Sequence, residues 1–162
     1  MPDWLSKLLY LFTAPLSKQG KPIYMDDPVI HRVHASSFAD PADVRRFRAC
    51  KAAGKSDQEC FKVGDNGLGC WGDLTAQMHT PMCALPPQDM EAKWGNVAKA
   101  KHKRVRVNLQ RSTRRPILCV LADRMPRKPN PSGAGIDLNP AASAALGLTP
   151  PHLVPVEWQW AE

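Results

Sequence analysis

The stretch from Val120 to Leu148, which reads VLADRMPRKPNPSGAGIDLNPAASAALGL, predicts more of the fold than any other part of the chain. An apolar run over Ile117–Leu121 predicts a strand that ends at an acidic residue, Asp123. A loop rich in Pro, Gly and basic residues follows, and a second acid, Asp137, then stands between two apolar residues. The stretch therefore places two carboxylates at the rims of ordered elements, a layout suited to acid–base chemistry on a polymer.

A short helix ends this stretch, and both of its ends can be predicted. Asn139 is a good N-cap, and Pro140 suits the first helical position, where its missing N–H is not needed. The alanine-rich run up to Leu146 favours helix, and Gly147 suits a left-handed C-terminal cap. We therefore expect a helix over Pro140–Leu146.

The order of these elements resembles a known family. A strand followed by Asp-Arg-x-Pro, a Gly-containing loop, and Ile-Asp-Leu before an Ala-rich helix are similar to the double-psi β-barrel proteins. Most similar are the rare-lipoprotein-A-like lytic transglycosylases, and more distantly the expansins; the resemblance is dense over Lys103–Leu148. It implies a mainly β fold, with a six-stranded double-psi β-barrel and one short helix over residues 63–162. A looser likeness, over Ser36–Trp71, is to small tail-associated proteins of bacteriophages.

The resemblance implies cleavage of peptidoglycan glycan strands, with Asp123 and Asp137 as the catalytic residues. Asp123, a carboxyl group at a strand end with apolar neighbours, is expected to be the general acid and base on the glycosidic oxygen, and Asp137 to orient or stabilise the developing charge. In the family, the Asp of Asp-Arg-x-Pro is a catalytic candidate, and the Asp of Ile-Asp-Leu matches a carboxylate essential for wall loosening in expansins. From the residues alone, Asp123 can instead cap a turn beside Arg124, and Asp137 can cap the Ala-rich helix.

One departure from the family favours an alternative function. The family has an active-site His in an upstream Thr-Ala-Ala-His segment, but the corresponding region here, Met82–Pro87, contains no His. The alternative is a non-catalytic barrel that binds the wall or forms part of a virion tail.

The glycine-rich stretch over residues 64–73 contains a tryptophan and predicts one of two arrangements. Either backbone and a flat ring approach a sugar in a groove, or Trp71 packs under the turn. It is not a phosphate loop, because the Lys-Ser/Thr ending is absent. The candidate substrate-binding residues are Trp71, Asp73, Thr75, Arg124, Arg127 and Lys128.

The net charge of +7 predicts a negatively charged partner: nucleic acid, a membrane surface or the carboxylate-bearing bacterial wall. The basic stretch Lys99–Arg115 alternates as a strand and returns into Ile117–Leu121, which predicts a hairpin. It contains no aromatic residue that could stack on a base, which argues against nucleic acid. Val154–Trp160 alternates as a last strand that closes the sheet.

The N-terminal part is expected to be helical. In residues 1–39 we expect a docking helix over Pro2–Leu16, which packs either against the domain or against a partner such as another virion protein, and then an extended arm. That helix is too short to span a membrane, so no transmembrane segment is expected, and Asp3 argues against the rival interpretation of a signal peptide. Residues 40–62 predict a helix–turn–helix, with Asp40 as the first N-cap and a capping box over Ser56–Glu59.

The five cysteines form no Cys-x-x-Cys pair and have no His cluster beside them, so we expect no metal site and no cofactor. Cys50 and Cys60 flank the helix–turn–helix and are the expected disulfide, whereas Cys119 lies in an apolar strand and is expected to be a free thiol. Cys70 and Cys83 could form a second disulfide. Disulfides would indicate a virion or an extracellular or periplasmic location, and five reduced thiols are the other interpretation.

Overall fold

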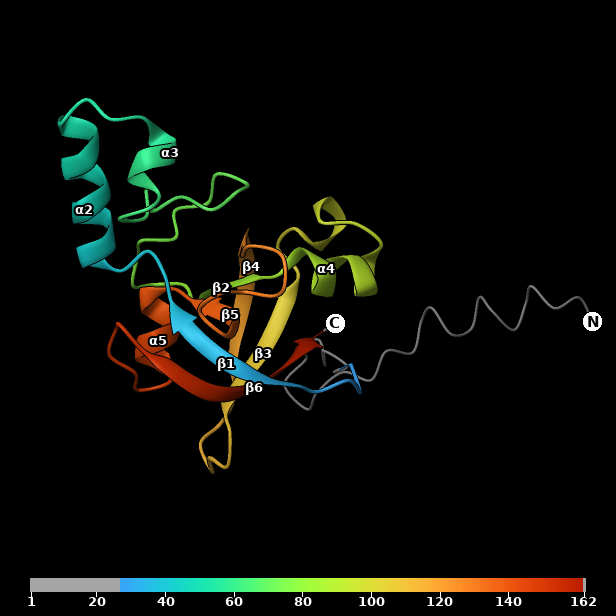
Figure 1. Cartoon of the computed structure of the whole chain (residues 1–162). Helices are drawn as coiled ribbons and strands as arrows, with labels where there is room; N and C mark the ends of the chain where they lie inside the picture. Colours follow the sequence, from blue (N-terminus) through green and yellow to red (C-terminus); the bar gives the residue numbers. More distant parts are fainter. Residues whose placement is uncertain (1–26, 162) are drawn as a thin grey trace, which may run out of the picture.

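Six strands of the computed structural model close into one barrel, which confirms the mainly β class predicted for this chain (Figure 1). The structure describes residues 27–161, so the predicted docking helix lies outside the described residues. The strands are β1 (His31–Ser37), β2 (Met82–Leu85), β3 (Arg104–Leu109), β4 (Ile117–Arg124), β5 (Ala134–Leu138) and β6 (Leu153–Ala161). The helices are α2 (Pro41–Ala52), α3 (Asp57–Cys60), α4 (Pro87–Trp94), α5 (Pro140–Ala145) and the 3-10 helix η1 (Ala98–Ala100).

The barrel has an approximate internal two-fold symmetry. Its strand order is β1-β5-β2-β4-β3-β6, and the pairs β1–β5 and β2–β4 are parallel while the other pairs are antiparallel. Exchanging β1, β2 and β3 with β4, β5 and β6 reproduces both this closed order and every strand direction. Such a two-fold arrangement is the one expected of a double-psi barrel.

The symmetry extends to the residues that follow the strands. β2 ends in Leu85 and is followed by Pro86 and then α4, and β5 ends in Leu138 and is followed by Asn139 and then α5. The backbone N–H of Met125 donates to the Leu85 carbonyl, and that of Phe38 donates to the Leu138 carbonyl. The sequence did not predict β2 or α4.

The barrel begins earlier in the chain than expected. The sequence placed its start at residue 63, whereas the first barrel strand is β1, which lies in the segment expected to be an extended arm. β1 pairs with both β5 and β6. Its sequence, HRVHASS, contributes only Val33 and Ala35 to the apolar interior, so its alternation is too weak to predict a strand.

The predicted basic hairpin and the predicted last strand are both present. β3 and β4 pair antiparallel, with Val105 and Val107 buried in the barrel. In β6, Val156, Trp158 and Trp160 are buried, and the two tryptophan rings meet edge to face. These side chains fill the barrel interior, so the barrel is a packed core.

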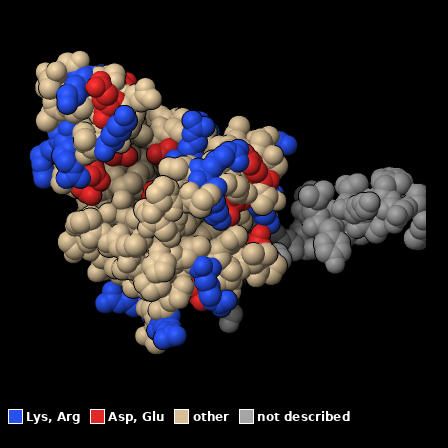
Figure 2. Space-filling model, in the orientation of Figure 1, with Lys and Arg blue, Asp and Glu red and all other residues tan. Residues whose placement is uncertain are grey.

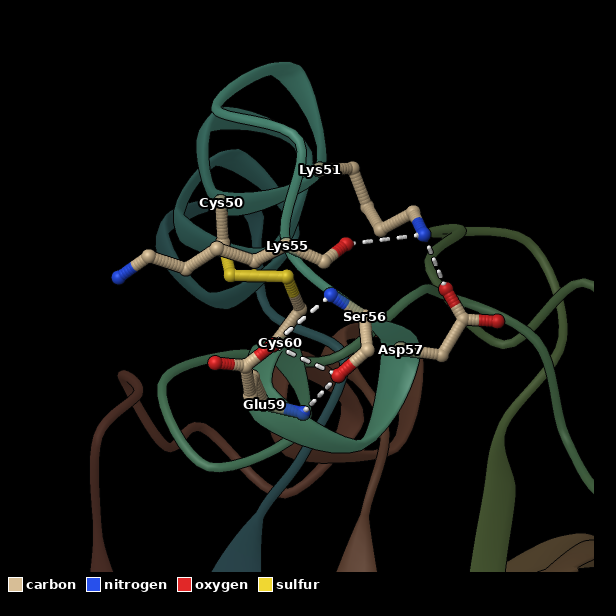
Figure 3. Close-up of a disulfide and its surroundings, with 7 residues drawn as sticks. All are labelled: Cys50, Lys51, Lys55, Ser56, Asp57, Glu59 and Cys60. Carbon is tan, nitrogen blue, oxygen red and sulfur yellow. Dashed lines mark hydrogen bonds and ion pairs between the residues drawn. A yellow bond between two sulfur atoms is a disulfide. The ribbon is translucent and has the colours of Figure 1, made fainter.

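Helices α2 and α3 form a helical lobe that projects from one end of the barrel (Figure 1). The Asp40 carboxylate accepts hydrogen bonds from the first turn of α2, as predicted. The capping box of Ser56 and Glu59 begins α3, and the Cys50–Cys60 disulfide joins the two helices (Figure 3). The predicted disulfide is therefore confirmed.

The remaining cysteines are free thiols. Cys119 is buried and unpaired with another sulfur, as predicted. Cys70 and Cys83 are also free, so the second disulfide that the sequence left open does not form. The physical reason is that Cys83 lies inside β2, fully buried in the barrel core, whereas Cys70 is exposed in the glycine-rich loop (residues 64–73).

One buried amide ties three parts of the chain together. The Asn139 side chain is fully buried, and its Oδ1 accepts hydrogen bonds of 2.9 Å from the backbone N–H groups of Ala142 and Met82. Its Nδ2 donates to the carbonyls of Thr75 and Thr80, each at 3.1 Å. Asn139 is therefore the predicted cap of α5, and it also fixes the start of β2 and the segment before it.

We expect Asn139→Ala to lower the free energy of unfolding by about 4 kcal/mol, because it leaves several buried backbone groups without partners. Asn96→Ala is the control, since Asn96 is exposed and its side chain accepts one hydrogen bond, from Lys99. That control should cost about 1 kcal/mol or less. Urea denaturation measures both, and equal losses would contradict the role assigned to Asn139.

Candidate functional site

The strand register brings the two predicted catalytic acids into one row. Asp123 of β4 pairs with Ala84 of β2, Ala84 pairs with Asp137 of β5, and Asp137 pairs with Ser36 of β1. We call these four residues the acid row. Because neighbouring strands lie about 4.8 Å apart, the backbones of the two acids are about 10 Å apart across β2.

The approximate two-fold symmetry of the barrel relates one half of the acid row to the other half. The exchange of strands relates Ser36 to Asp123 and Ala84 to Asp137. The backbone is therefore nearly symmetric here, while the side chains are not. Each half of the row holds one carboxylate, and the partner position holds a small residue.

Asp137 is largely buried and interacts with Ser36. The Ser36 hydroxyl donates a hydrogen bond to its carboxylate. Burial raises the pKa of Asp137 from 3.8 to about 6; the hydrogen bond from Ser36 opposes this shift, and the charges of Asp123 and Asp65 add to it. Asp137 does not cap the Ala-rich helix, because Asn139 does so. Asp137 is thus a carboxyl group that changes its protonation state at mildly acidic pH.

Asp123 holds the glycine-rich loop against the end of β4. Its Oδ1 accepts hydrogen bonds from the backbone N–H of Cys70 at 2.8 Å and from that of Arg124 at 2.7 Å. Burial raises the pKa of Asp123, and these two hydrogen bonds together with the Cys70 thiol oppose the shift. The loop approaches β4 so closely that a Cβ on Gly69 would lie 2.1 Å from the Ala122 carbonyl oxygen. Asp123 therefore has a contact of the kind expected of a turn cap.

Three of the predicted substrate-binding residues lie in or just after the glycine-rich loop. Trp71 is half-buried against the barrel core, with its ring edge-on to His102. Asp73 accepts a hydrogen bond from Nε2 of His102 at 2.8 Å. Thr75 is fully buried, so its side chain cannot contact a ligand in this conformation. The interpretation of a packed Trp71 is the one that this geometry favours.

The three basic candidates lie at the end of β4 and in the loop after it. Arg124 is exposed at the end of the strand. Arg127 forms an ion pair with Glu91, and Lys128 forms one with Asp89, both across to α4. These pairs hold the basic loop against a helix that the sequence did not predict, so the loop is anchored at this point.

Sequence reasoning missed three residues that lie beside the acids. Ser36 and Cys70 make hydrogen bonds to them, the charge of Asp65 raises the pKa of Asp137, and the charge of Asp123 raises the pKa of Asp65. None of the three belongs to a sequence motif, and only the pairing of β1 with β5 and the contact of the glycine-rich loop with β4 bring them to the acid row.

Among residues 27–161, no group of three or more His, Cys, Asp or Glu is placed to hold a metal ion. In the same part of the chain, no helix has the length and apolar character needed to cross a membrane.

Comparisons with known proteins leave the family of this chain open. No family model matches the sequence, and no curated protein matches it. Among solved structures, the chain is similar to Streptomyces papain inhibitor (SPI), with a TM-score of 0.47 and 17% sequence identity over 83% of this chain and 96% of that one. This is a likeness of the chain trace at low identity, and we draw nothing about function from it.

The contact between Asp123 and Cys70 predicts the reactivity of the thiol. Partial burial, and then the charge of Asp123, raise the pKa of Cys70 to about 11. Asp123→Asn removes that charge at nearly constant size, so we expect faster alkylation of Cys70 by iodoacetamide at mildly alkaline pH. Asp73→Asn, which alters the contact with His102, is the control and should leave the rate unchanged. An unchanged rate in Asp123→Asn would contradict the contact.

The raised pKa of Asp137 predicts a pH dependence of stability. Because the folded-state pKa lies above the ordinary value, the contribution of Asp137 is present in full below pH 3.8 and is lost as the pH rises through about 6. The stability of the wild type relative to Asp137→Asn should therefore fall over this window, as measured by urea denaturation at a series of pH values. Ser36→Ala removes the hydrogen bond that lowers this pKa, so it should move the window to higher pH. If the difference in free energy of unfolding between the wild type and Asp137→Asn does not vary with pH, the raised pKa of Asp137 is contradicted.

Proposed function

We propose that the protein cleaves peptidoglycan glycan strands, with Asp137 as the proton donor. The observation that carries the proposal is the acid row, in which a carboxyl group with a pKa of about 6 lies across one strand from a second carboxylate. Glycosidic cleavage requires a proton for the leaving oxygen, and a carboxylic acid with a raised pKa can supply it near neutral pH. The resemblance of Asp-Arg-x-Pro and Ile-Asp-Leu to the rare-lipoprotein-A-like transglycosylases supports the same reaction.

In this mechanism the two acids have different roles, and they are the reverse of those expected from the sequence, because the carboxylate of Asp123 accepts two backbone hydrogen bonds that favour its charged form. Asp137 donates its proton to the oxygen of the leaving sugar as the bond from that oxygen to C1 of muramic acid breaks. The 6-hydroxyl of the same muramic acid attacks C1, which closes a 1,6-anhydro ring, and its proton passes to the carboxylate of Asp137, which restores the acid. Asp123 stabilises the positive charge that develops on the sugar ring. Arg124 and Trp71 are the remaining candidates for contacts with the glycan.

The location that we propose is a virion or an extracellular or periplasmic site. The Cys50–Cys60 disulfide supports an oxidising environment, since such bonds are rare in the cytosol. The net charge of +7 suits the carboxylate-rich wall. The placement in a bacteriophage tail rests on the likeness over Ser36–Trp71.

A non-catalytic wall-binding or virion-structural barrel is the second candidate, and specific contacts favour it. The carboxylate of Asp123 already bonds to the glycine-rich loop, and Arg127 and Lys128 are paired with α4. The region Met82–Pro87 also lacks the His of the family that the sequence resembles. Each of these residues would then stabilise the fold without taking part in turnover.

Incubation of purified sacculi with the protein, followed by mass analysis of the released fragments, tests the proposal. Asp137→Asn should lower release by at least about a hundredfold, because the amide cannot donate and recover a proton, and Asp123→Asn should lower it less. Asp57→Asn is the matched control, since Asp57 pairs with Lys51 on the helical lobe. Muramic acid ends closed as 1,6-anhydro rings indicate a transglycosylase, whereas reducing ends that carry oxygen from water indicate a hydrolase. A wild-type protein that binds sacculi but releases nothing from mildly acidic to neutral pH would leave only the second candidate.

A further inference from the structure

A cavity of about 320 Å³ opens between α2 and the segment that follows the glycine-rich loop. Most of its lining is apolar, and two arginine side chains of α2 add positive charge. Figure 2 shows the helical lobe at upper left, where Lys and Arg side chains gather. The lining residues are Ala39, Pro41, Val44, Arg45, Arg48, Ala76, Gln77, Met78 and Pro140.

The walls of this cavity are fixed by hydrogen bonds within the chain. The Gln77 side chain donates to the Thr80 carbonyl at 2.8 Å and accepts from the backbone N–H groups of His79 and Thr80. Pro140 begins α5, which Asn139 caps, and the same Asn139 side chain bonds to the Thr75 carbonyl. The cavity is therefore formed before any ligand arrives, which lowers the cost of binding.

The two arginines of the cavity differ from the other cations of α2. Arg46 bonds to Asp43 and Lys51 pairs with Asp57, so their charges are already compensated. Arg45 and Arg48 are exposed, three residues apart on one helix face, and neither forms an ion pair with any other residue in the described range 27–161. Two adjacent guanidinium groups without a carboxylate partner suit an anionic ligand.

The cavity adjoins the acid row. Ala39 follows Ser36 by three residues, and Pro140 follows Asp137 by three residues. Ala39 also packs in the same apolar cluster as Ala84, the central residue of the row. Three residues of chain extend over at most about 11 Å, so a ligand that contacts both the cavity and the acid row would need to span only a short distance.

We propose that this cavity binds the carboxylate end of the short peptide stems that branch from the glycan strand. This assignment rests on the proposed function, which supplies the glycan. Arg45 and Arg48 bind the carboxylate, and the apolar lining contacts the methyl groups of the alanine residues in the stem. The apolar lining also disfavours a bare phosphate polymer, which has no methyl groups to bury.

N-acetyl-D-alanyl-D-alanine and its C-terminal amide are the probes, with binding measured by NMR titration of the full chain. The free acid should bind more tightly than the amide. The double substitution Arg45→Gln/Arg48→Gln should weaken binding of the acid by about tenfold and remove its preference over the amide, because the guanidinium contacts are partly solvated. Arg104→Gln/Arg115→Gln removes the same charge from the exposed hairpin and should leave binding unchanged.

The inference would be overturned by equal binding of acid and amide, by equal weakening in the two double variants, or by tighter binding of the L-alanine enantiomer. The last would assign the cavity to an ordinary protein C-terminus. Displacement of the probe by a glycerol phosphate oligomer at similar concentration would also overturn it, in favour of a phosphate polymer. This test and the test of the proposed function can fail independently. A protein that releases glycan fragments but does not bind N-acetyl-D-alanyl-D-alanine would disprove only the peptide site.

Discussion

The buried side chain of Asn139 is the constraint on which the arrangement of the site depends. An amide without partners in the interior is costly, and this one satisfies four backbone groups from three segments of the chain. It caps α5 directly after β5, and so it fixes the strand that carries Asp137. It also holds the segment after the glycine-rich loop, whose residues form one wall of the cavity beside α2.

The internal two-fold symmetry explains why two acids meet in one row. Each parallel pair, β1–β5 and β2–β4, ends at an equivalent place, so the symmetry relates Ser36 to Asp123 and Ala84 to Asp137. The two carboxylates have different surroundings. Asp137 is more deeply buried and has a single serine partner, whereas Asp123 accepts backbone hydrogen bonds that stabilise its charge. A difference of this kind is what separates a proton donor from a stabilising carboxylate in acid–base catalysis.

The helical lobe adds to the barrel a surface that the strands alone do not provide. The disulfide joins α2 to α3, each of which begins at its own N-cap, and the face of α2 that carries Arg45 and Arg48 lines the cavity. The proposed glycan site and the proposed peptide site thus lie on elements that follow one another in the chain, from Ser36 of β1 through Ala39 to α2. A branched polymer with sugars and peptides would contact both.

The sequence by itself determined the features that depend on neighbouring residues. The caps at Asp40, Ser56 and Asn139, the β3–β4 hairpin, the Cys50–Cys60 disulfide and the position of both acids at strand ends follow from local patterns. Capping, alternation and turn chemistry act over a few residues, so they can be read along the chain.

Only the tertiary structure decided which of these residues meet. β1 has too few apolar residues to be predicted as a strand, yet the barrel requires it to pair with β5, and this brings Ser36 to Asp137. α4 begins at the second of two prolines, Pro87, and supplies the partners of Arg127 and Lys128, so these two candidate ligand contacts are ion pairs within the chain. Thr75 is fully buried, and one of its contacts, the hydrogen bond from the Asn139 side chain to its carbonyl, joins residues 64 positions apart. The physical cause is that pairing across the barrel joins residues a hundred or more positions apart, such as Ser36 and Asp137 or Arg32 and Glu157, and no local pattern carries that information.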